Sequence, residues 1–168
     1  LADRFGSMPP DSYAALTTAD ITFPSITLSD GERVTLSYGS YRALLETNRK
    51  QDDRVAAYRA FHNIYAENQN TYAALYNGVL QRDWFNARAR GYETTLEAAL
   101  HGNNIPTSVV ENLIHSTRAG VEPLRRYHRL RRQVLGLKNY RLCDVSIPIV
   151  EHDARYEYDK VGEWVVDS

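Results

Sequence analysis

Residues 52–89 decide the fold, and they read DDRVAAYRAFHNIYAENQNTYAALYNGVLQRDWFNARA. The stretch contains no proline, and Gly78 is its only glycine. Aromatic and apolar residues recur along it at helical spacing, at Tyr58, Phe61, Tyr65, Tyr72, Leu75 and Val79. This spacing predicts one long helix from Asp52 to about Ala89, with a seam that packs on other helices and Asn68 as its polar member. Such a helix exceeds the usual length, which favours a large surrounding body.

The residues before this helix predict a linker and a β-hairpin. Residues 1–19 contain Gly6, Pro9 and Pro10, which favour a linker with a short helix after Pro10. Residues 20–37 place apolar residues on both sides of Asp30-Gly31, a strong hairpin signal. Pro24 lacks a backbone N–H, so the first strand should be interrupted there or lie at an edge.

The rest of the chain reads as further helices followed by an extended stretch. Start and stop signals divide residues 38–136 into shorter helices, at Ser40, Thr94, Thr107 or Ser108, Pro123 and Gly136. Residues 137–168 predict an extended stretch and then the start of a helix. We therefore expect a single mainly α segment over 1–168, with long helices and one small β-hairpin near the N-terminus.

The composition of the 168 residues is that of a globular protein. Hydrophobic residues make up 43% and charged residues 24%, which excludes a disordered tail or a collagen-like chain. A net charge of −1 gives no overall attraction to nucleic acid or to an anionic membrane. The chain has a single cysteine, Cys143, so it forms no internal disulfide and fits the cytoplasm.

No motif for metal or nucleophilic catalysis is present. A His-Glu-x-x-His zinc helix is missing from the 168 residues. Glu111 and His115 are four apart, but we interpret them as a solvated helical pair. The polar composition of a loop explains residues 151–153, Glu-His-Asp, equally well. Cys143 has no histidine nearby in the sequence and reads as a structural thiol. We thus assign no catalytic and no metal-binding residue, and substrate-binding residues stay unassigned.

The strongest charge feature is a basic cluster in residues 118–141. It contains Arg118, Arg125, Arg126, Arg129, Arg131, Arg132, Lys138 and Arg141, with Glu122 as the only acid. Such a stripe can bind phosphates. A charged face opposite an apolar one is also the ordinary design of a surface helix, and acids after residue 150 can neutralise it. Nucleic-acid binding is therefore the disfavoured interpretation.

Several pieces of the chain, in order, resemble the oligoendopeptidase F enzymes of the thimet-oligopeptidase-like superfamily. They are DITFP (20–24), DGE (30–32), YGSY (38–41), FNARARGYE (85–93), LEAAL (96–100), NNIP (103–106), RY (126–127), LR (130–131), LGL (135–137) and DVSIP (144–148) with Val150. The order and spacing of these pieces, which run over nearly the whole chain, make the resemblance specific.

The resemblance implies a zinc metallopeptidase with a largely helical fold, in which two halves enclose a channel for short, unstructured peptides. The family's His-Glu-x-x-His helix and its later glutamate ligand follow the segment matched here, so no catalytic or metal residue carries over to residues 1–168. The chain begins at Leu1, and the helical spacing of its apolar residues continues as far as Val165, so we expect a fragment of a larger chain.

The resemblance therefore implies a non-catalytic scaffold and channel-wall portion of a zinc-dependent endopeptidase, inactive alone. Its partners would be the remainder of its own parent chain and, for that parent, short peptides; zinc would belong to the full-length enzyme, and no membrane is implied. Two alternatives stay open. One is a free-standing helical binding or regulatory module, and the other is a nucleic-acid-binding helical domain that uses the basic helix 118–141.

Overall fold

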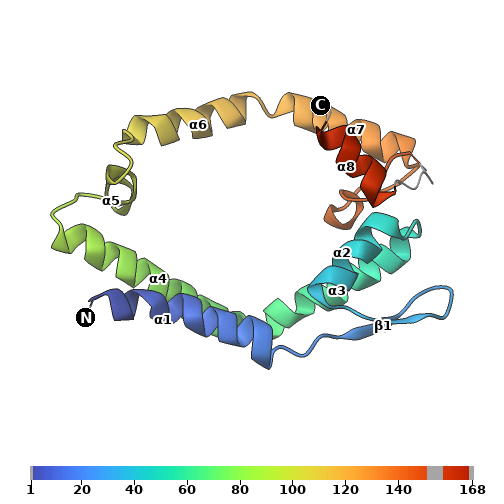
Figure 1. The fold of residues 1–168 in the computed structure, drawn as a ribbon, viewed down its shortest axis with the longest axis horizontal. Helices are drawn as coiled ribbons and strands as arrows, with labels where there is room; N and C mark the ends of the chain where they lie inside the picture. Colours follow the sequence, from blue (N-terminus) through green and yellow to red (C-terminus); the bar gives the residue numbers. More distant parts are fainter. Residues whose placement is uncertain (1, 151–156, 167–168) are drawn as a thin grey trace.

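The computed structural model describes residues 2–150 and 157–166 (Figure 1). Its elements are α1 (Ala2–Ala15), the π-helical turn η1 (Leu16–Asp20), β1 (Ser25–Thr27), β2 (Arg33–Thr35), α2 (Tyr38–Thr47), α3 (Gln51–Glu67), α4 (Gln69–Ala89), α5 (Thr95–His101), α6 (Thr107–Ala119), α7 (Glu122–Val134), the 3-10 turn η2 (Leu142–Asp144) and α8 (Tyr158–Val166). The predicted fold class, mainly α with one small β-hairpin near the N-terminus, is confirmed.

The helices follow one another around an open ring (Figure 1). On one side α1 lies along α4, and on the other α2 and the hairpin pack against α3. From α4 the chain passes through α5, α6 and α7, and η2 then brings it back to α3. The ring is thus closed by a contact between segments that are far apart in the sequence.

The hairpin forms at the predicted turn. Its two short strands are antiparallel, with Ile26 opposite Val34. Gly31 has a φ of +93°, a conformation that glycine adopts without strain and that the Asp-Gly pair predicts. The first strand begins at Ser25, directly after Pro24. This agrees with the expectation that Pro24, which has no N–H to donate to the ladder, interrupts the strand.

The core lies where the hairpin, α2, α3 and η2 meet. Its centre is a pair of stacked rings, Tyr41 and Phe61, with centroids 4.1 Å apart. Buried around them are Leu28, Leu36, Leu44, Leu45, Ala57, Ile64 and Cys143. Burial, with smaller contributions from Tyr58 and Cys143, raises the pKa of Tyr41 to about 12. The predicted seam residues Tyr58 and Tyr65 pack against this core.

The prediction of one unbroken helix over 52–89 is wrong at Asn68. The helix α3 ends at Glu67 and α4 begins at Gln69, with Asn68 between them at φ −106° and ψ 16°. The Asn68 side chain donates to the carbonyl of Ile64 at 2.9 Å, so it competes with the backbone for this acceptor. The polar member of the seam is therefore the place where the helix breaks.

The prediction of a linker over residues 1–19 is also wrong, because α1 spans most of them with Pro9 and Pro10 inside. Pro9 is buried and lies over Gly78 of α4, where an added Cβ would come within 3.3 Å of the Pro9 Cγ. Packing of α1 on α4 therefore outweighs the helix-breaking tendency of the two prolines.

Two predicted helix caps are wrong. The N-cap of α2 is Ser37, whose hydroxyl accepts from the backbone N–H of Ser40 at 3.2 Å, so Ser40 lies inside the helix. Pro106 occupies the N-cap position of α6, so neither Thr107 nor Ser108 caps it. The fixed φ of proline suits the residue before a helix, and the Pro106 carbonyl accepts from the backbone N–H of Val109 at 3.0 Å.

The other helix signals are confirmed. Thr94 caps α5 by accepting from the N–H of Glu97 at 3.0 Å. Pro123 lies in the first turn of α7, which restarts after α6 ends at Ala119. Gly136 has a φ of +63° and ends α7. The extended stretch after it contains only η2 up to residue 150, and α8 is the predicted C-terminal helix; residues 151–156 lie outside the described residues.

Within the described ranges, no helix has both the length and the hydropathy needed to cross a bilayer.

Asp53 joins the hairpin to α3. Its carboxylate accepts from the Ser29 backbone N–H at 2.9 Å, the Ser29 hydroxyl at 2.8 Å and the Asn48 side chain at 3.2 Å. Burial raises the pKa of Asp53, but these hydrogen bonds outweigh it, so the pKa lies below its ordinary value. The ionised carboxylate therefore contributes stability above the pKa of the unfolded chain, and this contribution is lost as the pH falls through the folded value.

We expect Asp53→Asn to lower the free energy of unfolding at neutral pH, because the amide accepts these hydrogen bonds less well. The gap to the wild type should stay constant above about pH 5 and shrink in more acidic solution, where Asp53 is protonated. Urea denaturation at a series of pH values measures the gap. The matched control is Asp52→Asn, which changes an exposed neighbour. A gap that grows as the pH falls would contradict the assignment.

Candidate functional site

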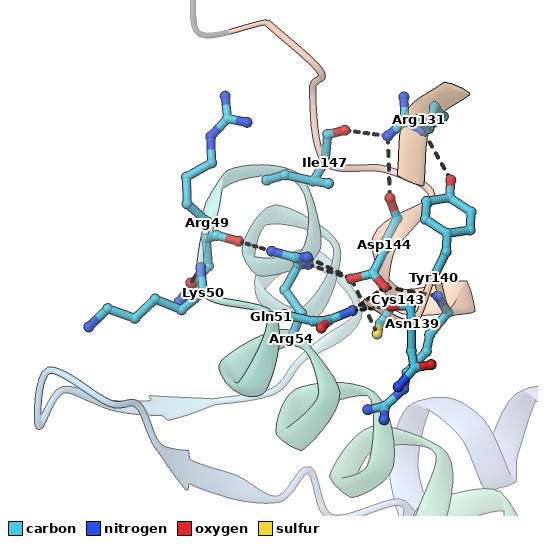
Figure 2. A network of polar contacts seen from close by, with 12 residues as sticks. Arg49, Lys50, Gln51, Arg54, Arg131, Asn139, Tyr140, Cys143, Asp144 and Ile147 are labelled. Atoms are coloured by element: carbon cyan, nitrogen blue, oxygen red, sulfur yellow. Dashed lines mark hydrogen bonds and ion pairs between the residues drawn. The ribbon is translucent and has the colours of Figure 1, made fainter. Parts of the chain in front are cut away.

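The most densely bonded polar group in the described chain is the carboxylate of Asp144, which is fully buried in η2 (Figure 2). Its Oδ1 accepts from Arg54 Nε at 3.2 Å and Arg54 Nη2 at 2.6 Å. Its Oδ2 accepts from Gln51 Nε2 at 2.7 Å and from the backbone N–H of Arg141 at 2.9 Å. Charge-assisted bonds of this kind are the strong ones, and here they join α3 to a segment 90 residues away.

Arg131 of α7 extends the same network and is only 5% exposed. Its guanidinium donates to the hydroxyls of Tyr140 at 3.0 Å and Tyr127 at 3.2 Å. It also donates to the backbone carbonyls of Ile147 and Asp144 (Figure 2). Burial lowers the pKa of Arg131, but the two tyrosine hydroxyls outweigh it and hold the pKa above its ordinary value. We call Gln51, Arg54, Arg131, Tyr140 and Asp144 the Asp144 network.

The basic cluster predicted for 118–141 is therefore not one continuous surface. Arg131 points inward, and its guanidinium donates to backbone carbonyls instead of being available to phosphates. Glu122 binds Arg129 and lies 4.0 Å from Arg125 in a second ion pair. The hydrogen bond from Arg129 outweighs a smaller effect of burial and lowers the pKa of Glu122. Arg126 and Arg132 are exposed, and neither forms an ion pair within the described part of the chain.

Cys143 is buried beside this network. Its sulfur lies 3.8 Å from Asp144 Oδ1, and burial, together with the Asp144 carboxylate, raises the pKa of the thiol. A thiol with a raised pKa carries little thiolate at neutral pH and is a poor nucleophile. The structure therefore supports the interpretation of Cys143 as a structural thiol.

The candidate metal ligands do not come together. Over residues 2–150 and 157–166, no group of three or more His, Cys, Asp or Glu side chains is placed to hold a metal ion. Glu111 and His115 are both exposed on α6. Residues 151–153 lie outside the described residues. The described side chains therefore do not fit a zinc site, and the assignment of no catalytic and no metal-binding residue stays a prediction.

The helices α6 and α7 both carry large apolar side chains that are exposed. Leu113 is 64% exposed and Leu124 is 55% exposed, and both helices place further apolar residues beside them, namely Val109, Ile114, Tyr127, Leu130 and Val134. The predicted apolar stripe of α7 is thus exposed, while its central arginine is buried.

Sequence reasoning missed the Asp144 network. The only sequence signal near it was the resemblance of residues 144–148 to one piece of a known family, which says nothing about a partner 90 residues earlier. The sequence around Arg54 carries no signal that sets it apart from other charged residues of the helix.

We expect Asp144→Ala to destabilise the chain by about 3–5 kcal/mol, because it leaves the Arg54 guanidinium buried without its counter-charge. Equilibrium urea denaturation followed by circular dichroism measures the loss. Glu111→Ala removes an exposed carboxylate and should change stability by less than about 0.5 kcal/mol. Equal effects of the two substitutions would contradict the role assigned to Asp144.

Comparison with known proteins gives a consistent result over most of the chain. The chain is 33% identical over 150 residues to the group B oligopeptidase PepB of Streptococcus agalactiae. The matched residues make up 89% of this chain and 25% of that protein. It is 34% identical over 141 residues to the oligopeptidase PepF of Bacillus subtilis, covering 84% of this chain and 21% of that one. It therefore spans about a quarter of the length of these curated relatives.

The fold agrees with a solved relative as well. The crystal structure of oligoendopeptidase-F from Enterococcus faecium superposes with a TM-score of 0.83 at 31% identity, over 89% of this chain and 29% of that one. These similarities confirm the resemblance to oligoendopeptidase F. Residues 44–160 match Peptidase family M3, and the chain belongs to that family.

Proposed function

We propose that this chain is a non-catalytic scaffold and channel-wall portion of a zinc-dependent endopeptidase that cleaves short peptides. The observation that carries the proposal is the superposition of 89% of the chain on 29% of the Enterococcus faecium oligoendopeptidase-F. A segment that corresponds to less than a third of such an enzyme contributes structure to the whole. Its own described side chains offer no constellation for the chemistry.

The structure supports a scaffold role in physical terms. The Asp144 network ties α3, α7 and residues 139–147 together, so the ring is held by buried charge-assisted bonds. The apolar faces of α6 and α7 lack a cover within the described residues, and the remainder of the parent chain would supply one. Burying those side chains would be favourable at roughly 25 cal/mol per Å² of apolar surface.

Zinc belongs, in this proposal, to the parent enzyme and would be held by residues outside 1–168. The metal would activate the attacking water there, while this chain contributes rigid walls. Short peptides are the substrates of the parent, and the remainder of the parent chain is the partner. We place the protein in the cytoplasm, since its single cysteine is buried and forms no disulfide.

The free-standing module is the second candidate, and the well-packed core around Phe61 favours it. A chain that folds cooperatively as a monomer and exposes no dye-binding surface would support the module. Self-association or strong dye binding would support the scaffold, because both report uncovered apolar faces.

We expect the purified 168-residue chain to contain no stoichiometric zinc and to cleave no short fluorogenic peptide. Metal analysis and a peptidase assay with and without a chelator measure this. The control is a full-length member of Peptidase family M3, expressed under the same conditions, which should bind zinc and show chelator-sensitive cleavage. Zinc at one ion per chain together with chelator-sensitive cleavage by the 168 residues would overturn the proposal.

A further inference from the structure

We propose that Asn68, together with η1, forms a two-position joint inside the ring. At this joint the pair α1 and α4 rotates as a rigid body relative to the hairpin, α2 and α3. The two parts meet at an angle where α3 ends and α4 begins (Figure 1). We call them the α1–α4 arm and the α2–α3 arm. The role of such a joint in a channel wall rests on the proposed function, whereas the rotation itself is a property of this chain alone.

The chain crosses between the arms at η1 and again at Asn68, and a polar side chain competes with the helix backbone at each crossing. Asn68 donates to the Ile64 carbonyl at 2.9 Å, and Thr17 of η1 donates to the Tyr13 carbonyl at 2.8 Å. Each side chain takes the acceptor four residues back, which the backbone of a continuing helix would otherwise use. Both crossings therefore consist of element-terminal residues, and such residues absorb the backbone rotation in hinges.

The arms share little apolar packing. The hydrophobic core of the described chain draws its members from the hairpin, α2, α3 and η2, and from neither α1 nor α4. Across the junction, the Tyr65 and Tyr72 rings have their centroids 5.4 Å apart, and the Tyr72 ring also lies 6.0 Å from that of Tyr13. A contact made by a few rings, without shared core side chains, belongs to the weakly held parts of a structure.

One polar atom in this contact is poorly accommodated. The Tyr72 hydroxyl exposes less than 1 Å² and has no hydrogen-bond partner within the described residues. Burial, with smaller contributions from Tyr38 and Tyr13, raises the pKa of Tyr72, so the hydroxyl is neutral. A buried hydroxyl without a partner has lost its bonds to water without replacement, which disfavours the position that buries it. A rotation that opens the contact between Tyr65 and Tyr72 returns this hydroxyl to water.

The rest of the ring can follow such a rotation. Gly91 lies just after α4 with a φ of +78°, and glycine adopts positive and negative φ about equally well. Between α6 and α7 the chain has only Gly120 and Val121. Because these links contribute no side chain to the hydrophobic core of the described chain, the Asp144 network can stay intact while the angle between the arms changes.

The test is double electron–electron resonance on the 168-residue chain, with spin labels at Ala43→Cys in α2 and Ala89→Cys in α4. Both alanines are exposed. The Cys143 thiol is buried with a raised pKa, so it reacts slowly with the label. We expect two distances for this pair. The matched control is Ala43→Cys with Ala66→Cys, two exposed positions of the α2–α3 arm, which should give a single distance.

Three variants of the labelled chain locate the joint. Tyr72→Phe removes the unpartnered hydroxyl and should reduce the population of the second distance roughly fivefold, the size of effect expected for one such group. Tyr76→Phe removes a hydroxyl from a side chain of α4 that is 65% exposed, and it should leave both populations unchanged. Asn68→Gly should widen the distance distribution, because glycine makes no bond to the Ile64 carbonyl and adopts more backbone conformations.

A single distance of equal width in the two labelled pairs would overturn the inference, and so would equal effects of Tyr72→Phe and Tyr76→Phe. An unchanged distribution in Asn68→Gly would overturn the assignment of the joint to this residue. These outcomes leave the proposed function in place, because zinc content and peptide cleavage test that separately.

Discussion

The structure depends on the buried ion pair between Arg54 and Asp144. Both side chains are almost fully removed from water, and such a pair is tolerated only when its remaining donors and acceptors are satisfied. Gln51 and the backbone N–H of Arg141 donate the remaining hydrogen bonds to the Asp144 carboxylate. The carbonyl of Asn48 accepts from Arg54 at 2.8 Å. Ordering the chain between the two partners costs conformational entropy, which rises only slowly with the length of the loop. One well-bonded pair can therefore close a ring of helices that has few other cross-contacts.

The same network sets the rotation of α7 about its axis. Arg131 turns inward to the carbonyls of residues 144 and 147, whereas Leu124 and Leu130 of the same helix are exposed. Of the five arginines of α7, only Arg131 is buried, and the other four face water. These leucines are exposed in a chain that spans about a quarter of the length of its curated relatives.

Local chemistry made part of this fold predictable. The Asp30-Gly31 turn needs a positive φ, Gly136 needs one at the end of α7, and both are read from neighbouring residues alone. Features that arise from long-range packing were not predictable. In the sequence Pro9 disfavours a helix, and the packing of Pro9 on Gly78 of α4, which favours one, is seen only in the structure. Asn68 fits a polar position in a helical seam, and only its bond to the Ile64 carbonyl shows a break. The candidate network was missed for the same reason, since no local pattern pairs Arg54 with Asp144.

The most direct test of this account is amide hydrogen exchange on the wild-type chain and on Asp144→Ala, read segment by segment. The account predicts that the variant loses protection in two places at once, in α3 near Gln51 and in residues 139–147, because the Asp144 carboxylate accepts hydrogen bonds from Gln51 and Arg54 on one side and from the Arg141 N–H on the other. The contact between α1 and α4 should keep its protection, since it does not depend on the network. Loss confined to residues 139–147, with α3 unchanged, would contradict the claim that Asp144 closes the ring.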